Sequence, residues 1–428
     1  MYNTDSFMKA KIIQFLQDNP LYKNSFYVMA SNMVLMGTGF IFWIIAARLY
    51  STAQIGIATS LYSLLTLLSS LSVFGFGSGL MRFLPGSDSK NEKINSSILI
   101  TACASLLLTT ATVFALPKIS PHLAFVTHNN LFLISFVIFT VMQTLNFLIE
   151  AILIALREGN QILIKNSILS TFKLLLPFTL IFMGAYGIFA SLEVAVIISV
   201  IYGFIIVAVM HKIKFRPTFH KASVKQMSFF SFGNYIAGLA STAPTYILPI
   251  FITNMLGPTT AAYYYIVGTT SNVLFMVPAI ITQNLLVEGS YGEKEIKIHV
   301  RKAARLLAVI LIPAIAGMIL FGNYLLLVFG KKYSIEGLHL LQLFALSCIL
   351  VAANYIFGTI ITLLHKIKLL IILNFIATGL LLLFTYLFLN SFHMGLLGIG
   401  IAAILTQTIL ITLYAIVFIR LNLLSLLF

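Results

Sequence analysis

Three ionisable residues, Glu150, Lys173 and Glu193, lie within long apolar stretches of the sequence. A charge at the middle of a bilayer costs roughly 2.5–3.5 kcal/mol on insertion scales, so such a residue usually faces a polar cavity or a partner. Glu150 precedes Arg157, and Lys173 follows Lys165, by nearly the same number of residues. We therefore expect Glu150 and Lys173 at matched depth, either as a structural ion pair or in a cavity. Because a carboxyl group can exchange a proton or bind a cation, Glu150 and Glu193 are candidates for ion or proton coupling.

Two arginines, Arg48 and Arg82, lie at the ends of apolar stretches. A guanidinium group binds phosphate in a bidentate manner and stays charged, so either residue, like Lys173, is a candidate for binding a pyrophosphate or an acidic sugar. The alternative is that each side chain reaches the membrane interface and serves only as an anchor. Arg48 could also pair with Glu193, since both are expected near the same membrane boundary.

The stretch GFGSGLMRFLPG, residues 75–86, has the glycines of a phosphate-binding loop. It does not complete the G-x-G-x-x-G fingerprint, and it closes an apolar helix where the fingerprint requires a preceding strand. The sequence therefore gives no nucleotide site here. Gly75 and Gly79 instead form a G-x-x-x-G face, which predicts close packing of this helix against a neighbour.

Uncharged polar residues gather in two later apolar stretches. Their hydroxyls, amides and rings suit sugars, and Tyr246, Asn254 and Asn272 are the candidates for substrate contact. For the run Tyr263 to Tyr265, an interfacial aromatic belt is the competing interpretation.

The composition is that of an integral membrane protein. Of 428 residues, 60% are hydrophobic and only 9% are charged, and the mean hydropathy is +1.03. A net charge of +15 would suggest a nucleic-acid partner in a soluble chain, but in a membrane chain it reports topology, so no nucleic acid is expected. No motif predicts a catalytic residue, a cofactor or a metal site. Since about 20 apolar residues span a bilayer as a helix, the sequence predicts an all-α fold of twelve spans. They are expected at 26–47, 55–80, 95–116, 131–155, 166–184, 187–210, 229–255, 261–286, 303–329, 338–363, 368–389 and 395–419.

The lysines and arginines support this count. With the N-terminus in the cytoplasm, 21 of the 26 fall in cytoplasmic segments, while Arg48, Lys118, Lys331 and Lys332 fall outside and Lys173 lies within a span. This asymmetry follows the positive-inside rule and places both termini in the cytoplasm. Residues 7–18 could form a short amphipathic helix on the membrane surface.

The chain also resembles itself at a spacing of about 208 residues, which indicates two six-helix halves. Because six is even, both halves enter the membrane from the same side, and the repeat is parallel. The predicted parts are an N-terminal segment 1–25, a six-helix bundle 26–210, a basic linker 211–228, a second bundle 229–420 and a tail 421–428. The alignment places Asn166 over Asn374, Glu150 over Gly358, Lys173 over Leu381 and Glu193 over Ile401. The three charges are therefore unrepeated, which favours a task specific to the first bundle.

Three stretches carry a resemblance to a known family: ARLYSTAQIGIATSLYS (47–63), GFGSGLMRFLPG (75–86) and ALREGN (155–160). They resemble polysaccharide flippases, the oligosaccharide-lipid exporters of bacterial inner membranes related to multidrug and toxin extruders. The resemblance covers both halves and the order of the motifs. The acidic position common in the family after the first helix is absent, since Thr52 and Ala53 stand there.

The resemblance implies a MATE-like fold of two six-helix bundles in a V around a central cavity. It implies translocation of an undecaprenyl-pyrophosphate-linked oligosaccharide, such as an O-antigen or capsule repeat unit, across the bacterial inner membrane by alternating access. The implied partners are this lipid-linked substrate, membrane lipids, and a polysaccharide polymerase with its chain-length proteins.

Other functions stay open. A multidrug cation antiporter shares the fold. A major-facilitator transporter shares the six-plus-six design, but the loop after the second span lacks its acidic-glycine-double-arginine motif. A membrane glycosyltransferase or polymerase is disfavoured because the predicted outer loops are short and nearly free of acids. A non-transporting scaffold is disfavoured by the unrepeated intramembrane charges.

Overall fold

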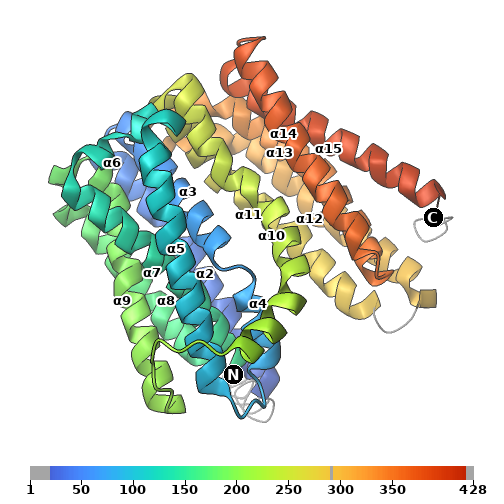
Figure 1. Cartoon of the computed structure of the whole chain (residues 1–428). Helices are drawn as coiled ribbons and strands as arrows, with labels where there is room; N and C mark the ends of the chain where they lie inside the picture. Colours follow the sequence, from blue (N-terminus) through green and yellow to red (C-terminus); the bar gives the residue numbers. More distant parts are fainter. Residues whose placement is uncertain (1–19, 290–292, 421–428) are drawn as a thin grey trace, which may run out of the picture. The chain divides into compact units, whose positions relative to one another are not determined.

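The computed structural model describes residues 20–289 and 293–420, and these residues form helices joined by short loops, with no strand among them (Figure 1). Twelve of these helices are long and apolar enough to cross a membrane, which confirms the predicted number within the described part of the chain. The long helices are α2 (Pro20–Leu49), α3 (Thr52–Ser72), α5 (Lys90–Ile119), α7 (Asn130–Ala155), α8 (Gly159–Thr179), α9 (Ala185–His211), α10 (Lys221–Leu256), α11 (Pro258–Gly289), α12 (Glu293–Leu327), α13 (Lys331–Leu363), α14 (Ile367–Asn390) and α15 (Gly395–Arg420). The short ones are α4 (Phe76–Phe83), η1 (Pro121–Leu123), α6 (Phe125–His128) and η2 (Ile181–Met183). The predicted amphipathic segment at 7–18 and the tail 421–428 lie outside the described residues.

The second predicted span, 55–80, is not one helix. Helix α3 ends at Ser72, and α4 starts after Gly75, whose φ of 78° is left-handed and suits a residue without a side chain. The Tyr235 hydroxyl donates to the Leu71 carbonyl at 2.6 Å, which satisfies an acceptor that the end of α3 leaves free.

The close packing predicted for Gly75 and Gly79 is confirmed. A Cβ atom added to Gly75 would lie 2.9 Å from the Ser231 Cβ, and one added to Gly79 would lie 3.0 Å from the Met227 Cβ. The G-x-x-x-G face of residues 75–79 therefore packs directly on the first part of α10.

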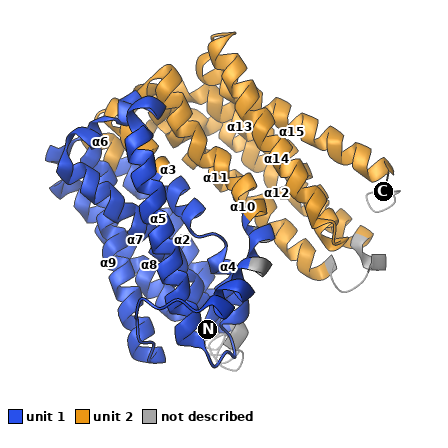
Figure 2. Cartoon of the chain, viewed as in Figure 1, with its two compact units in different colours: residues 1–45, 65–235 blue, residues 46–64, 236–428 orange. Residues whose placement is uncertain are grey.

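Contacts divide the described chain into two compact units (Figure 2). Unit 1 comprises residues 20–45 and 65–235, and unit 2 comprises residues 46–64, 236–289 and 293–420. Helix α3 thus begins in unit 2 and ends in unit 1, and α10 does the reverse. The domain boundaries expected at 210 and 229 remain predictions, because contacts rather than chain order define these units.

The internal repeat is visible within each unit. In unit 1, α9 packs on α7 and α8, and in unit 2, α15 packs on α13 and α14. The turns repeat as well: Arg157 after α7 and His365 after α13 have φ values of 61° and 57°. In each turn the backbone N–H of the following residue donates a hydrogen bond to the carbonyl five residues earlier. Glu158 donates to Leu153 in unit 1, and Lys366 donates to Ile361 in unit 2. Such left-handed C-caps satisfy the last carbonyls of a helix.

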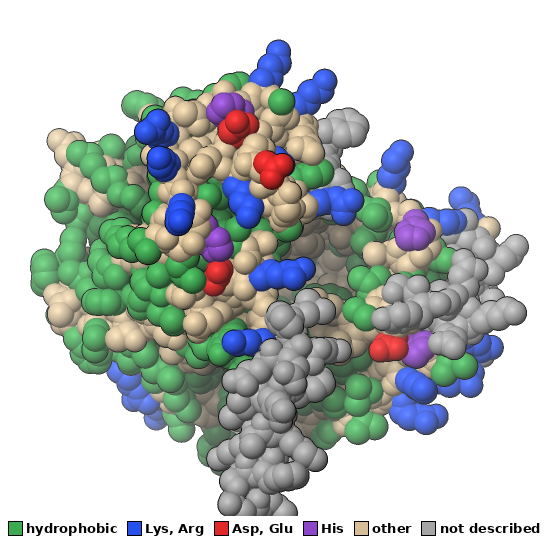
Figure 3. Space-filling view, turned by 90° about the horizontal axis from the view of Figure 1, so that it is seen from below, with side chains coloured by type: hydrophobic (Ala, Val, Ile, Leu, Met, Phe, Trp, Pro, Cys, Tyr) green, Lys and Arg blue, Asp and Glu red, His purple; other side chains and the backbone are tan. Residues whose placement is uncertain are grey.

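The connector after α9 is basic and is fixed to the start of α5 in unit 1. The Asn95 amide donates to the Lys214 carbonyl at 2.9 Å, and the His220 amide donates to Ser96 at 3.0 Å. Exposed lysines and arginines follow along it: Lys212, Lys214, Arg216, Lys221 and Lys225. Figure 3 shows lysines and arginines across the end of unit 1 seen from below. The positive-inside rule predicts that this end is the cytoplasmic one.

Candidate functional site

Helices α2 and α8 of unit 1 share polar contacts that repeat every seven residues, as core positions do in a coiled coil. The partners in each contact are 135 residues apart in the chain, so the two helices run parallel. From the start of α8 to its middle, the contacts are the Gly159 amide to Asn24 Oδ1 at 2.6 Å, Asn166 Nδ2 to Ser31 Oγ at 2.8 Å, and Lys173 Nζ to Thr38 Oγ1 at 3.3 Å.

The partner of Glu150 is Lys165, so the predicted pair of Glu150 with Lys173 is wrong. Lys165 is fully buried, and its Nζ donates to Asn146 Oδ1 at 2.7 Å and to Glu150 Oε2 at 3.4 Å. Lys173 is also buried, at 6% exposure, but its hydrogen bond goes to the Thr38 hydroxyl. No salt bridge joins Lys173 to a carboxylate among the described residues.

Helix ends explain this error. The sequence places Lys165 in a loop, whereas α8 already begins at Gly159, so Lys165 lies inside it. Glu150 lies five residues before the end of α7 and Lys165 six after the start of α8, so this pair is at matched depth. Lys173 lies about 12 Å further along α8 at 1.5 Å per residue.

Glu193 lies in the buried stripe of α9 and faces the core of unit 1. Its side chain is 0% exposed, and neither carboxylate oxygen has a hydrogen-bond partner. Phe189, Val196 and Val200 occupy the same stripe at spacings of three and four residues. The possible pair of Arg48 with Glu193 stays a prediction, because the two residues belong to different units. Within unit 2, Arg48 Nη2 donates to the Val328 carbonyl at 2.9 Å. Val328 directly follows α12, so Arg48 satisfies a carbonyl at a helix C-terminus.

The remaining sequence candidates are spread over the chain. Arg82 is exposed at the end of α4, and Asn254 is exposed near the end of α10. Tyr246 is partly buried in α10 and does not line the cavity described next. Asn272 does line it.

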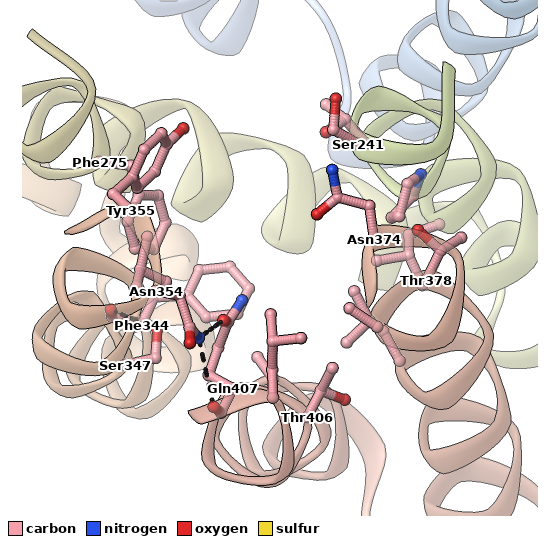
Figure 4. A pocket seen from close by; sticks show the side chains of 18 of the residues that line it. Ser241, Phe275, Phe344, Ser347, Asn354, Tyr355, Asn374, Thr378, Thr406 and Gln407 are labelled. Atoms are coloured by element: carbon pink, nitrogen blue, oxygen red, sulfur yellow. Dashed lines mark hydrogen bonds between the residues drawn. The ribbon is translucent and has the colours of Figure 1, made fainter. Parts of the chain in front are cut away.

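Unit 2 contains a cavity of about 680 Å³ between α10, α11, α13, α14 and α15 (Figure 4). This volume is within the range of small-molecule sites, roughly 300–1,000 Å³. Asn354 Nδ2 donates to Gln407 Oε1 at 2.5 Å on one side, while Asn374 and Ser241 lie opposite. Tyr264 and Tyr265 also line the cavity, whereas Tyr263 does not; the interfacial aromatic belt stays a competing interpretation of this run.

The sequence did not identify Lys165, Asn146, Asn354 or Gln407 as site residues. The internal repeat could have found two of them, because Asn146 and Asn354 are separated by the same 208 residues as Asn166 and Asn374. Neither asparagine belongs to a recognised motif, so the repeat spacing was the signal that the sequence offered.

The family described as "Polysaccharide biosynthesis protein" matches residues 21–287. No curated protein matches the sequence significantly.

Solved structures of transporters share the fold. The lipid II flippase MurJ in an inward closed conformation is similar with a TM-score of 0.69 and 13% identity, over 92% of this chain and 87% of that one. An inward-facing multidrug resistance MATE transporter of the MOP superfamily is similar with a TM-score of 0.67 and 14% identity, over 93% of this chain and 98% of that one. A MOP superfamily transporter from Pyrococcus furiosus is similar with a TM-score of 0.53 and 13% identity, over 97% of this chain and 98% of that one. At these identities the likeness shows the fold, an all-α membrane transporter fold of twelve helices.

Proposed function

The chain belongs to the polysaccharide biosynthesis protein family, and from this premise we propose that it is a flippase for undecaprenyl-pyrophosphate-linked oligosaccharides. It would move an O-antigen or capsule repeat unit across the bacterial inner membrane by alternating access, with both termini in the cytoplasm. No covalent step is part of this proposal. A polymerase and its chain-length proteins would take up the product on the outer side.

The observation that carries the proposal is the buried ammonium group of Lys173. It lies in the middle of α8, beside the hydroxyl of Thr38, and no carboxylate within the described chain forms a salt bridge with it. Thr38 in turn is 2.9 Å from the Ser170 hydroxyl. An ammonium group with two hydroxyls is suited to a phosphate anion, and a bound pyrophosphate would offset the cost of burying the lysine.

We predict that Lys173→Met lowers flipping of the lipid-linked oligosaccharide by roughly 10–100-fold, since a hydrogen bond to a charged group contributes about 1.5–3 kcal/mol. Lys173→Arg retains the charge and is expected to keep part of the activity. The measurement is transfer of fluorescently labelled substrate in proteoliposomes, together with the precursor that accumulates on the cytoplasmic side in a deletion strain. Lys118→Met removes an exposed lysine of the same unit and is the matched control. Equal transport by Lys173→Met and Lys118→Met would refute the role of Lys173.

A multidrug cation antiporter is the second candidate, and Glu193 is the observation that favours it. A buried carboxyl group with two partnerless oxygens could hold a proton or a cation in turn. Drug hypersensitivity of a deletion strain, without accumulation of a lipid-linked precursor, would select this function over the flippase.

Within the flippase proposal, we assign ion or proton coupling to Glu193 and the salt bridge with Lys165 to Glu150. Glu193→Gln keeps the shape but cannot change charge, so we expect transport to fall at least about tenfold, equivalent to about 1.4 kcal/mol. The variant should also lose any response to collapse of the proton gradient by an ionophore. Normal expression with unchanged, gradient-dependent transport would exclude the coupling role.

A further inference from the structure

The cavity within unit 2 differs from the corresponding interior of unit 1, and the internal repeat makes this comparison possible. In unit 1, Asn146 and Glu150 project from α7 toward Lys165 of α8. Their equivalents about 208 residues later, Asn354 and Gly358, line the cavity instead. Unit 2 thus has the same asparagine amide as unit 1, but it has glycine where unit 1 has the Glu150 carboxylate.

Helix α14, the counterpart of α8, likewise lacks the charged residues of unit 1. Lys165 corresponds to Leu373, and Lys173 corresponds to Leu381, which lines the cavity. Asn374 and Thr378 also line it, at the positions equivalent to Asn166 and Ser170. Unit 1 therefore has charged side chains at these positions, whereas unit 2 has uncharged residues that line a cavity.

We propose that this cavity binds an uncharged, hydroxyl-rich group, namely sugar residues of the substrate. The inference rests on the proposed function and assigns a separate site to the saccharide part of the lipid-linked molecule. Its basis is the lining: no Lys, Arg, His, Asp or Glu of the described residues contributes to it. Burying an ion there would carry a large desolvation cost without a counter-charge, so a pyrophosphate or a cationic drug does not fit.

Hydrogen-bonding groups in the cavity call for a ligand that both donates and accepts. Asn354 Oδ1 and Thr406 Oγ1 are buried without a hydrogen-bond partner, although buried polar atoms are usually paired. In Figure 4, Asn354 lies on the left of the cavity, Thr406 lies at its lower edge, and the amide of Asn374 projects from the right. A sugar hydroxyl can both donate and accept a hydrogen bond. The neighbouring aromatic rings, such as Phe344 and Tyr355, can pack against the apolar faces of the sugar rings.

Two substitutions in the lining test this site without removing a structural contact. Gly268 lines the cavity, and no atom lies within 4 Å of the position of an added Cβ, so Gly268→Leu would fill the space and also favour the helix. Thr406→Val removes one partnerless hydroxyl at nearly constant volume. Thr385→Val is the matched control, because Thr385 is equally buried and partnerless but does not line the cavity.

The experiment measures binding of two probes to the purified protein in nanodiscs. One probe is the lipid-linked oligosaccharide extracted from the deletion strain, and the other is undecaprenyl pyrophosphate without sugars. We expect the wild-type protein and Thr385→Val to bind the glycosylated probe at least about tenfold more tightly. Gly268→Leu should reduce this preference to less than about threefold and Thr406→Val should weaken it, with binding of the bare carrier unchanged, whereas Lys173→Met should weaken both probes.

The outcomes separate the two proposals. A wild-type preference that survives in Gly268→Leu, as for a cavity that holds only water, would overturn the saccharide site and leave the flippase proposal intact. Equal binding of both probes by the wild type would also overturn the saccharide site and leave the flippase proposal intact. Binding of neither probe would overturn the flippase proposal and the saccharide site with it.

Discussion

Lys165→Met is expected to lower the free energy of unfolding by about 3 kcal/mol. Removing one partner of a buried ion pair typically costs about 3–5 kcal/mol, and the lower end applies because the Glu150 side chain is 30% exposed. The variant leaves the Glu150 carboxylate without its cation and Asn146 Oδ1 without its donor. At roughly 2–4 °C per kcal/mol, the melting temperature in detergent should fall by about 6–12 °C.

Two further variants identify the cause. Glu150→Gln combined with Lys165→Met removes both charges, so the double variant should be less destabilised than the sum of the single ones, by roughly 0.5–3 kcal/mol. Lys173→Met takes a second buried lysine from the same helix but breaks no salt bridge, so its melting temperature should change little while its transport falls. A melting temperature of Lys165→Met equal to that of the wild type would contradict the structural role.

Gly56→Ala is expected to destabilise unit 2 by about 3 kcal/mol or more. A Cβ atom on Gly56 would lie 1.7 Å from the carbonyl oxygen of Pro258 and 2.5 Å from its carbon. The obstacle is backbone at the start of α11, which cannot rotate aside as a side chain would, so α3 and α11 would have to separate by more than about 1 Å in a close-packed interior. This shift would also disturb the neighbouring contact between the Ser60 and Thr253 hydroxyls, which are 2.5 Å apart.

The measurement is the yield of monodisperse protein and its melting temperature in detergent. Gly317→Ala is the matched control in the same unit, since it lies within α12 and has no atom within 4 Å of an added Cβ. It should be neutral or stabilising by up to about 1 kcal/mol, as alanine favours a helix interior over glycine. If Gly56→Ala behaves like this control, the close approach of α3 and α11 is not needed for folding.

Together, the two units show one bundle plan with different interiors. Both contain the turn exemplified by Arg157 and His365 and the same order of packed helices. The plan therefore does not depend on the charges of Lys165, Glu150 and Lys173, which only unit 1 contains. This freedom allows one interior to take the anionic part of a substrate and the other to take an uncharged part, as proposed above.

The sequence by itself determined the number of spans and the internal repeat, because these depend on the length and order of the apolar stretches. Their orientation in the membrane stays a prediction from where lysines and arginines fall. The sequence also determined the close packing at Gly75 and Gly79, a local property of two small residues on one face. Only the tertiary structure decided that Glu150 pairs with Lys165, that Glu193 has no hydrogen-bond partner, and that Asn354 and Asn374 face one cavity. The physical reason is that such contacts depend on where helices end and which faces meet: moving the start of α8 by seven residues exchanges one lysine partner for another about 12 Å away.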